Sequence, residues 1–272
     1  MDRILQGSSA PITVTLLAGS VPTDPSPDSA TVTVTRADGT AVVTAQAATG
    51  TGVGTFSFTL TPAQTALLDV LTATWTFTSG GQPQSRQTRH EVVGGFLCTL
   101  QELKTVLSTL DDATLAARRV DVEQELEKAL GYACVPRYVM ETRYARDGVV
   151  TTRSPLRDVR SLSVTRAGVT TLWATDQVTA LTLESWGVCG VWCNGPVALG
   201  YEHGLDFPDE DIREAALLLA AEAYGPNAVD GRIVQTQADS MMVQYASPLA
   251  GGPFVGARLN QIVNANRLPA IA

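Results

Sequence analysis

The chain contains 272 residues, which at roughly 150 residues per domain suggests about two domains, and its hydrophobic fraction of 44% is sufficient for well-packed cores. Charged residues make up only 17%, and the formal net charge of −8 excludes a basic nucleic-acid-binding surface as the main feature. The longest strongly apolar run, residues 215–221, is too short to span a bilayer, and the first residues lack the apolar stretch of a signal peptide, so we expect no membrane part and synthesis in a cytoplasm.

Residues 1–94 are predicted to form an all-β domain. The segment is rich in threonine, and apolar and polar residues alternate in several short stretches, as is typical of half-buried strands. These stretches are residues 11–16, 30–35, 56–60 and 71–77. Their number and length suit a small immunoglobulin-like sandwich, with Trp75 in its core and the glycine-rich residues 50–54 as a turn.

A helical period begins after this segment. Thr99 and Glu102 have the spacing of a capping box, in which the two side chains and backbone N–H groups bond reciprocally at a helix start. A second helix is predicted to begin at Asp111 or Asp112 and to stop at Gly131. Because the connection is short, the two helices should form an antiparallel hairpin.

A β-rich stretch follows the predicted helical hairpin. Period two recurs over about residues 137–201, and a third helix is predicted over residues 208–223, where acidic residues complement the helix dipole. The apolar face of this third helix consists mainly of small residues. It is predicted either to pack within the subunit or to form a contact between subunits.

The last part of the chain, residues 231–272, is predicted to be a tail that folds on a partner or stays disordered. Within it, residues 234–245 suggest a strand or hairpin arm and residues 255–266 a short helix. The predicted fold class is therefore α+β multidomain: an N-terminal all-β immunoglobulin-like sandwich over 1–94, a mainly helical connector domain with the β insertion over 95–230, and an extended C-terminal tail.

Three motifs of the second segment carry a family resemblance. They are ALGYACVPR at residues 129–137, VALGYEHG at residues 197–204 and FPDEDIREAA at residues 207–216. In this order they resemble the head-to-tail connector (adaptor) proteins of long-tailed double-stranded DNA bacteriophages, over about residues 97–225. The N-terminal segment resembles immunoglobulin-like modules appended to some phage structural proteins.

The resemblance implies a structural role in the virion neck, with assembly in the host cytoplasm. Subunits would form a ring, expected to be a dodecamer, below the portal protein, with helices packed subunit on subunit. The β insertion would face neighbours or the downstream neck, stopper or tail protein, and the tail would reach toward the portal. DNA would pass through the lumen without specific binding, and no enzyme activity, metal or cofactor is implied.

Four arginines are candidates for ion pairs at these assembly surfaces: Arg118, Arg119, Arg213 and Arg258. The alternative for each is an exposed salt bridge within its own chain. The net charge of −8 suits a channel wall that repels phosphates, although an ordinary solubility charge explains it equally well.

The cysteines suggest neither a strong metal site nor a disulfide framework. Three residues separate Cys189 from Cys193, and a zinc ion would need two further ligands from Cys98, Cys134 or His203. A disulfide between Cys189 and Cys193 in a mature particle is an open alternative. We predict reduced thiols, because a secretion signal is not evident.

Two rival functions remain open on the sequence. In the first, the N-terminal domain is a binding module that recognises a host glycan or protein. In the second, Glu202, His203 and Asp206 form a hydrolytic centre, since a carboxylate and an imidazole can share a proton near neutral pH. We predict structural roles for these three residues, with Asp206 as a cap and Gly204 at a turn, because no nucleophile motif accompanies them.

Overall fold

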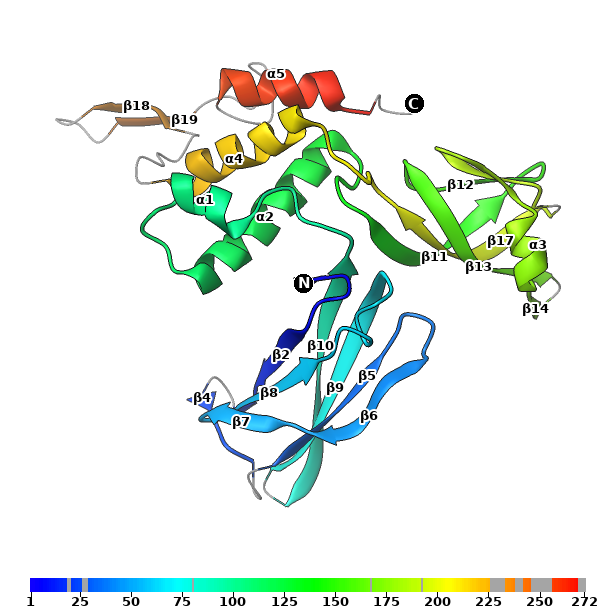
Figure 1. Cartoon of the computed structure of the whole chain (residues 1–272), viewed down its shortest axis with the longest axis horizontal. Helices are drawn as coiled ribbons and strands as arrows, with labels where there is room; N and C mark the ends of the chain where they lie inside the picture. Colours follow the sequence, from blue (N-terminus) through cyan, green and yellow to red (C-terminus); the bar gives the residue numbers. More distant parts are fainter. Residues whose placement is uncertain are drawn as a thin grey trace. The chain divides into compact units, whose positions relative to one another are not determined.

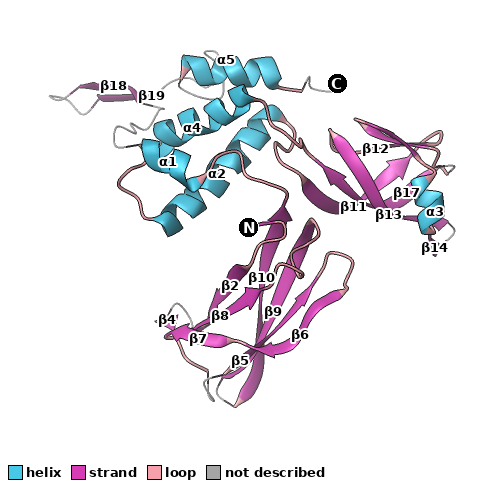
Figure 2. Cartoon of the chain, viewed as in Figure 1, coloured by secondary structure: helices cyan, strands magenta, loops and turns pink. Residues whose placement is uncertain are grey.

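The computed structural model describes residues 1–18, 21–25, 29–79, 81–166, 168–191, 193–225, 233–237, 242–245 and 256–268. The chain divides into two compact units. The first unit combines Met1–Gly95 with Pro136–His203, and the second combines Phe96–Val135 with Gly204–Ala272. Figures 1 and 2 show the strands of the first unit and the helices of the second. Among the described residues, no helix has both the length and the apolar character to cross a membrane.

The N-terminal part of the first unit is a β-sandwich. Its larger sheet has the order β1-β10-β9-β5-β6, and the smaller one has the order β2-β8-β7. The strands of the larger sheet are β1 (Asp2–Leu5), β10 (Gln82–Val93), β9 (Asp69–Ser79), β5 (Ala30–Thr35) and β6 (Ala41–Ala47). Those of the smaller sheet are β2 (Ala10–Thr15), β8 (Thr55–Leu60) and β7 (Thr49–Gly52), and β3 (Leu17–Ala18) pairs separately with β4 (Val21–Pro22).

The two sheets enclose one hydrophobic core. Alternate residues of each strand point inward, so Val32 and Leu71 of the larger sheet and Phe56 of the smaller one lie in the same cluster. Trp75 is fully buried there, as predicted, and its indole N–H donates to the Thr88 hydroxyl at 3.1 Å. The predicted strand over residues 30–35 is confirmed as β5.

Residues 136–203 complete the first unit with two smaller sheets. One has the order β11-β17-β13-β14, and the other has the order β12-β16-β15. The strands are β11 (Arg137–Ala145), β12 (Val149–Thr151), β13 (Leu156–Arg166), β14 (Val169–Leu172), β15 (Thr182–Glu184), β16 (Gly187–Cys189) and β17 (Gly195–His203). A short helix, α3 (Thr175–Thr179), follows β14. Leu162, Leu199 and Tyr201 are fully buried in the core of this part.

The second unit contains the longer helices. These are α1 (Leu100–Val106), α2 (Asp112–Leu130), α4 (Glu210–Tyr224) and α5 (Ala257–Asn266). The predicted capping box is present, since the Thr99 hydroxyl accepts from the Glu102 N–H at 3.1 Å and the Glu102 carboxylate accepts from the Thr99 N–H at 2.7 Å. Gly131 ends α2 with φ of 85°, a left-handed conformation that glycine adopts without steric cost.

The described parts of the C-terminal region contain a pair of strands and a helix. β18 (Ile233–Gln237) pairs antiparallel with β19 (Met242–Tyr245), as the predicted hairpin arm suggested. Helix α5 buries Leu259, Ile262 and Val263 in the helical unit. The rest of the predicted tail lies outside the described residues.

The predicted fold class is wrong in its balance of helix and strand. The structure is mostly β, with 45% strand and 24% helix, and it contains no mainly helical connector domain among the described residues. The error has a physical source. The sequence pattern predicts residues 137–201 as an insertion into a helical domain, but they form two sheets with a core of their own. The two units also interleave along the chain, whereas the predicted domains follow one another.

Candidate functional site

The first two predicted assembly arginines lie on α2. The Arg118 guanidinium bonds to Asp121 one turn along the helix at 3.1 Å and lies 4.5 Å above the ring of Tyr224. Arg119 stacks on Phe96, with its guanidinium carbon 3.4 Å from the ring centroid. Both side chains therefore interact within the helical unit.

The other two arginines connect helices of the same unit. Arg213 of α4 bonds to Glu102 of α1 at 2.5 Å. Arg258 of α5 bonds to Glu214 of α4 at 2.8 Å, and its guanidinium lowers the pKa of the Glu214 carboxyl below its usual range. Exposed pairs of this kind contribute little to stability. Pairing between subunits stays a prediction, and each of these arginines would have to share or exchange its present partner.

Helix α2 also carries two buried carboxylates that the sequence analysis missed. Glu123 accepts the backbone N–H of Leu97 at 2.7 Å, and Glu127, one turn later, accepts that of Cys134 at 3.1 Å. These two carboxylates therefore bond the segment before α1 and the segment after α2 to one face of α2. Their burial could have been predicted, because the two residues are one helical turn apart and each directly follows an apolar position of the helix.

All four cysteines lie in the described part of the chain, and they are thiols rather than members of disulfides. Burial, with Glu123 as the next cause, raises the pKa of Cys98 to about 12, so this thiol is protonated at neutral pH and is neither a nucleophile nor a ready metal ligand. In the part of the chain that the structure describes, no three His, Cys, Asp or Glu side chains lie close enough together to hold a metal ion.

The proposed hydrolytic residues do not converge. Glu202 and His203 are neighbours on β17, so their side chains point to opposite faces of the sheet. Glu202 forms ion pairs with Arg160 and, at 3.5 Å, with Arg157. The carboxylate is thus held by guanidinium groups on one face while the imidazole lies on the other.

His203 is buried, with 4% of its surface exposed, and its Nδ1 has no hydrogen-bond partner in the described structure. Burial is the main cause that lowers its pKa to about 4, with the positive charges of Arg153 and Arg137 as further causes. The imidazole is therefore neutral at pH 7. Gly204 lies in the predicted turn, with φ of 106°, and an added Cβ would fall 2.1 Å from the Val135 carbonyl oxygen.

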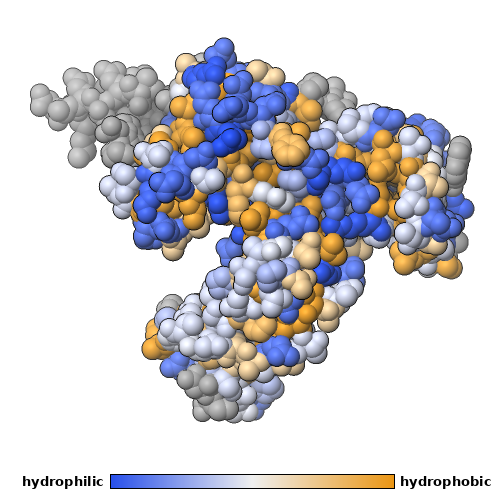
Figure 3. Space-filling view, in the orientation of Figure 1, coloured by the Kyte–Doolittle hydropathy of each residue, from blue (hydrophilic) through white to orange (hydrophobic). Residues whose placement is uncertain are grey.

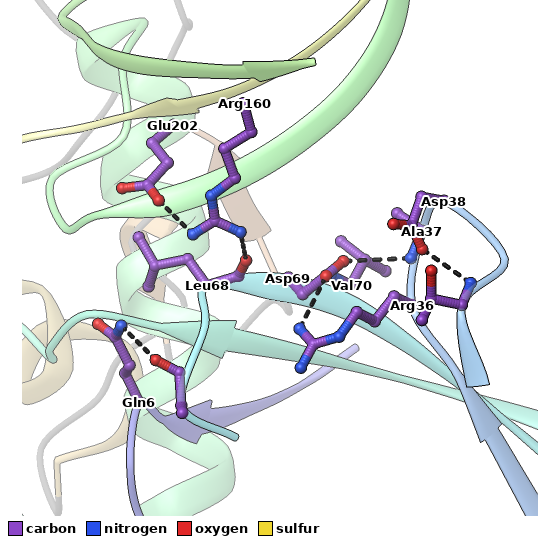
Figure 4. Close-up of polar contacts among 11 residues, drawn as sticks. Gln6, Arg36, Ala37, Asp38, Leu68, Asp69, Val70, Arg160 and Glu202 are labelled. Carbon is purple, nitrogen blue, oxygen red and sulfur yellow. Dashed lines mark hydrogen bonds and ion pairs between the residues drawn. The ribbon is translucent and has the colours of Figure 1, made fainter. Parts of the chain in front are cut away.

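Within the first unit, Arg160 forms the first of two arginine junctions between the sandwich and the β11-β17-β13-β14 sheet. Arg160 of β13 donates to the carbonyl oxygen of Leu68 at 2.6 Å and pairs with Glu202 (Figure 4). Its guanidinium carbon also lies 4.9 Å from the centroid of the Tyr138 ring. Close by, Asp69 accepts from the Arg36 guanidinium at 3.2 Å and from the Ala37 N–H at 3.1 Å.

The second junction is centred on Glu91 of β10, which is only 3% exposed. Arg137 of β11 donates to both of its carboxylate oxygens, at 2.6 and 2.7 Å, and Arg3 of β1 lies 3.5 Å away. This bidentate geometry is the strong form of an arginine–carboxylate pair. The sequence carried no signal for it, because 46 residues separate Glu91 from Arg137.

The β11-β17-β13-β14 sheet exposes a face without charged residues across several rows of its strands. Tyr144 lies opposite Pro196, and Ala198 lies between Thr142 and Ser163, which in turn faces Leu172. We refer to the following residues as the uncharged sheet face: Met140, Thr142, Tyr144, Ser161, Ser163, Leu172, Pro196 and Ala198. The apolar side chains Leu172 and Tyr144 are 70% and 68% exposed.

Two further surface features belong to the helical unit. Phe207, just before α4, is 90% exposed, the highest value among the large apolar residues described. A groove of about 460 Å³ runs between α2 and α4, with an apolar floor and a charged rim. It is lined by Asp121, Val122, Gln124, Glu125, Lys128, Leu219, Ala223 and Tyr224.

Neither models of known protein families nor curated proteins match this chain.

Proposed function

We propose that this protein is a structural subunit of a bacteriophage neck, which forms a ring between the portal and the downstream neck or tail protein and lets DNA pass through its lumen. The resemblance of residues 97–225 suggests this role. The observation that supports it best is the uncharged sheet face, which exposes Met140, Tyr144 and Leu172 in the segment expected to face neighbouring proteins.

Exposed apolar side chains that share one face favour association. Burying a large apolar side chain contributes roughly 1.5–3 kcal/mol, so a cluster of them is a ready source of binding energy for a neighbour. Single exposed apolar residues are common, but here Tyr144, Pro196 and Leu172 occur on one sheet with small hydroxyl residues between them. Because the uncharged sheet face has no charged side chains, removing water from it on binding costs little free energy.

The arginine junctions support a structural rather than a displayed role for residues 1–95. Glu91 and Arg160 join the N-terminal sandwich to the sheets of residues 136–203 within one compact unit. A domain that binds a receptor at a distance from the particle would be expected to be attached through a flexible linker. The sandwich is instead built into the body that carries the uncharged sheet face.

The test is the copy number of this chain in purified virions that encode it, relative to the portal subunit, by quantitative mass spectrometry. A ratio near one to one is the expected result for stacked neck rings. A chain absent from the particle would contradict the proposal.

A further inference from the structure

Strand β14 is an unprotected edge of the β11-β17-β13-β14 sheet. All four of its residues are exposed, with Val169 at 67% and Leu172 at 70%. Its sequence, VTTL, contains no charge, proline or glycine, and its pairing with β13 has no bulge. Natural sheets ordinarily protect their edges with such features, because an open edge pairs readily with another chain. Apolar surface is present in the region where Figure 1 labels β14 (Figure 3).

Other edge strands of the first unit carry protecting features of this kind. β11, at the opposite edge of the same sheet, contains Glu141 and Arg143. β6 pairs with β5 through register shifts, and its residue Ala45 has a positive φ of 44°. β2 contains Pro11. β14 is therefore open to pairing in a way that these three strands are not.

The pairing of β13 with β14 shows which backbone groups are open. The N–H of Trp173, the residue after β14, donates to the carbonyl oxygen of Leu162 at 2.9 Å. Bonded positions alternate along an antiparallel pair, so the N–H and C=O groups of Thr170 and Leu172 point away from β13. Among the described residues, no strand or loop backbone bonds to these outward groups.

The same chain contains a hairpin without a larger sheet. β18 and β19 pair with each other (Figure 1), and neither packs substantially against another described element. Their sequences, IVQTQ and MVQY, contain no charged residue, although charged residues make up 17% of the chain. A two-stranded hairpin alone is marginally stable in water and needs a further strand or a packed surface. The hairpin is therefore suited to joining the edge of an existing sheet.

We propose that the β18-β19 hairpin of one copy of this chain adds to β14 of a second copy and extends its sheet. Each copy carries one hairpin and one open β14 edge, so head-to-tail addition satisfies every copy in a series. In the single chain the hairpin and β14 belong to separate sheets, which leaves both available to a second copy. The inference rests on the proposed function only for the place where the copies meet.

The length and charge of the two partners agree. β14 and β19 each contain four residues and β18 contains five, so an added strand can reach all the outward groups of β14. The three strands are uncharged, so their pairing desolvates no charged side chain of its own. Main-chain hydrogen bonds supply the attraction, as in other cases of strand addition. Each bond contributes little, so one contact is weak and a closed series of contacts is much stronger.

The experiment measures the association of the purified full chain by sedimentation velocity, at concentrations up to about 1 mM. Thr170→Pro removes an N–H that points away from β13 and leaves the backbone bonds to β13 in place. Val243→Pro prevents regular pairing by β19. We expect the wild type to associate and each proline substitution to raise the dissociation constant at least about tenfold.

The matched control is Thr170→Val. It loses the same hydroxyl contact with Thr165 as the proline variant, 2.9 Å in the wild type, but it keeps the outward N–H. It should therefore associate like the wild type. Hydrogen exchange adds a direct measurement, since the amides of Thr170 and Leu172 should exchange more slowly when the wild type is associated than when it is dilute.

A mixture of the two proline chains tests whether the contact joins different copies. The Thr170→Pro chain keeps its hairpin, and the Val243→Pro chain keeps its open edge. Each alone should be monomeric, whereas the mixture should contain heterodimers, which native mass spectrometry detects. Addition of the hairpin to β14 of its own chain predicts no heterodimers.

Thermal unfolding should show that both proline chains are folded. If the Thr170→Pro chain is unfolded, the Val243→Pro chain and the exchange of the Leu172 amide in the wild type decide the question. The proposal is overturned if the wild type stays monomeric, if Val243→Pro associates like the wild type, or if two folded proline chains form no heterodimer. Because virion copy number tests the neck role separately, either proposal can fail alone.

Discussion

Glu91 is the residue whose substitution should affect the first unit most. Its carboxylate is buried and bonded by Arg137 and approached by Arg3, so removing its charge would leave guanidinium groups without compensation in a dry environment. We expect Glu91→Gln to lower the free energy of unfolding by about 3 kcal/mol, measured by urea denaturation. The exposed Glu184→Gln should change it by less than about 0.5 kcal/mol, and equal effects of the two substitutions would contradict this assignment.

His203 should make the stability depend on pH. Its folded pKa of about 4 lies below the ordinary value of 6.5, so the unfolded chain takes up a proton first as the pH falls. The stabilising contribution is complete above about pH 6.5 and is lost between there and pH 4, by about 3 kcal/mol. His203→Gln should flatten this dependence in denaturation curves at several pH values.

The second buried imidazole, that of His90, should also contribute to the pH dependence of stability. Burial also lowers the pKa of His90, whose Nε2 lies 2.9 Å from the Thr88 hydroxyl, so some pH dependence should remain in the His203 variant. A His203→Gln protein with the full wild-type slope would contradict the prediction.

Individual residue roles were predictable where they depended on local geometry. The strand period was enough to show that Glu202 and His203 point to opposite faces, once β17 is recognised. The partners of Glu91, Glu123 and Arg160 were not predictable, because each bond joins segments that approach only through the tertiary fold.

At the scale of elements, the capping box at Thr99 should stabilise α1 measurably. The Thr99 hydroxyl and the Glu102 carboxylate satisfy two backbone N–H groups that the helix itself cannot bond. Thr99→Ala should lower the free energy of unfolding of the helical unit by about 1 kcal/mol. Thr99→Ser, which keeps the hydroxyl, should stay within about 0.5 kcal/mol of the wild type, and a Ser variant as unstable as the Ala variant would exclude capping as the cause.

Element boundaries followed the strength of local signals. The predicted ends at Thr99 and Gly131 agree with the structure, since capping chemistry lies within a few residues of sequence. The strand order β11-β17-β13-β14 was not predictable, because β17, one of the two central strands, is the last of the four in sequence. The local pattern therefore predicts an insertion where the structure has sheets with a core of their own, and the predicted fold class is wrong for this reason.

For the whole molecule, the uncharged sheet face should control assembly. We expect Tyr144→Lys combined with Leu172→Glu to abolish incorporation of the chain into virions, because both changes place charges where a neighbour has to bind. The matched control, Val21→Glu with Val53→Lys, changes two apolar residues of similar exposure in the sandwich and should leave incorporation intact. Native mass spectrometry of the soluble variants would show that both remain folded, and incorporation of the test variant at the wild-type level would contradict the assignment.

The interleaving of the two units has a consequence for synthesis on the ribosome. Helices α1 and α2 emerge long before α4 and α5, with the sheets of residues 136–203 translated in between. Until α4 and α5 are translated, the apolar side of the helical hairpin has no partner from its own unit. Arg137 can bond to Glu91 only after the sandwich has left the exit tunnel, because it follows the sandwich in the sequence. A cut at a single point of the gene leaves at least one unit incomplete, so the two units can be separated only by rejoining distant pieces of the chain.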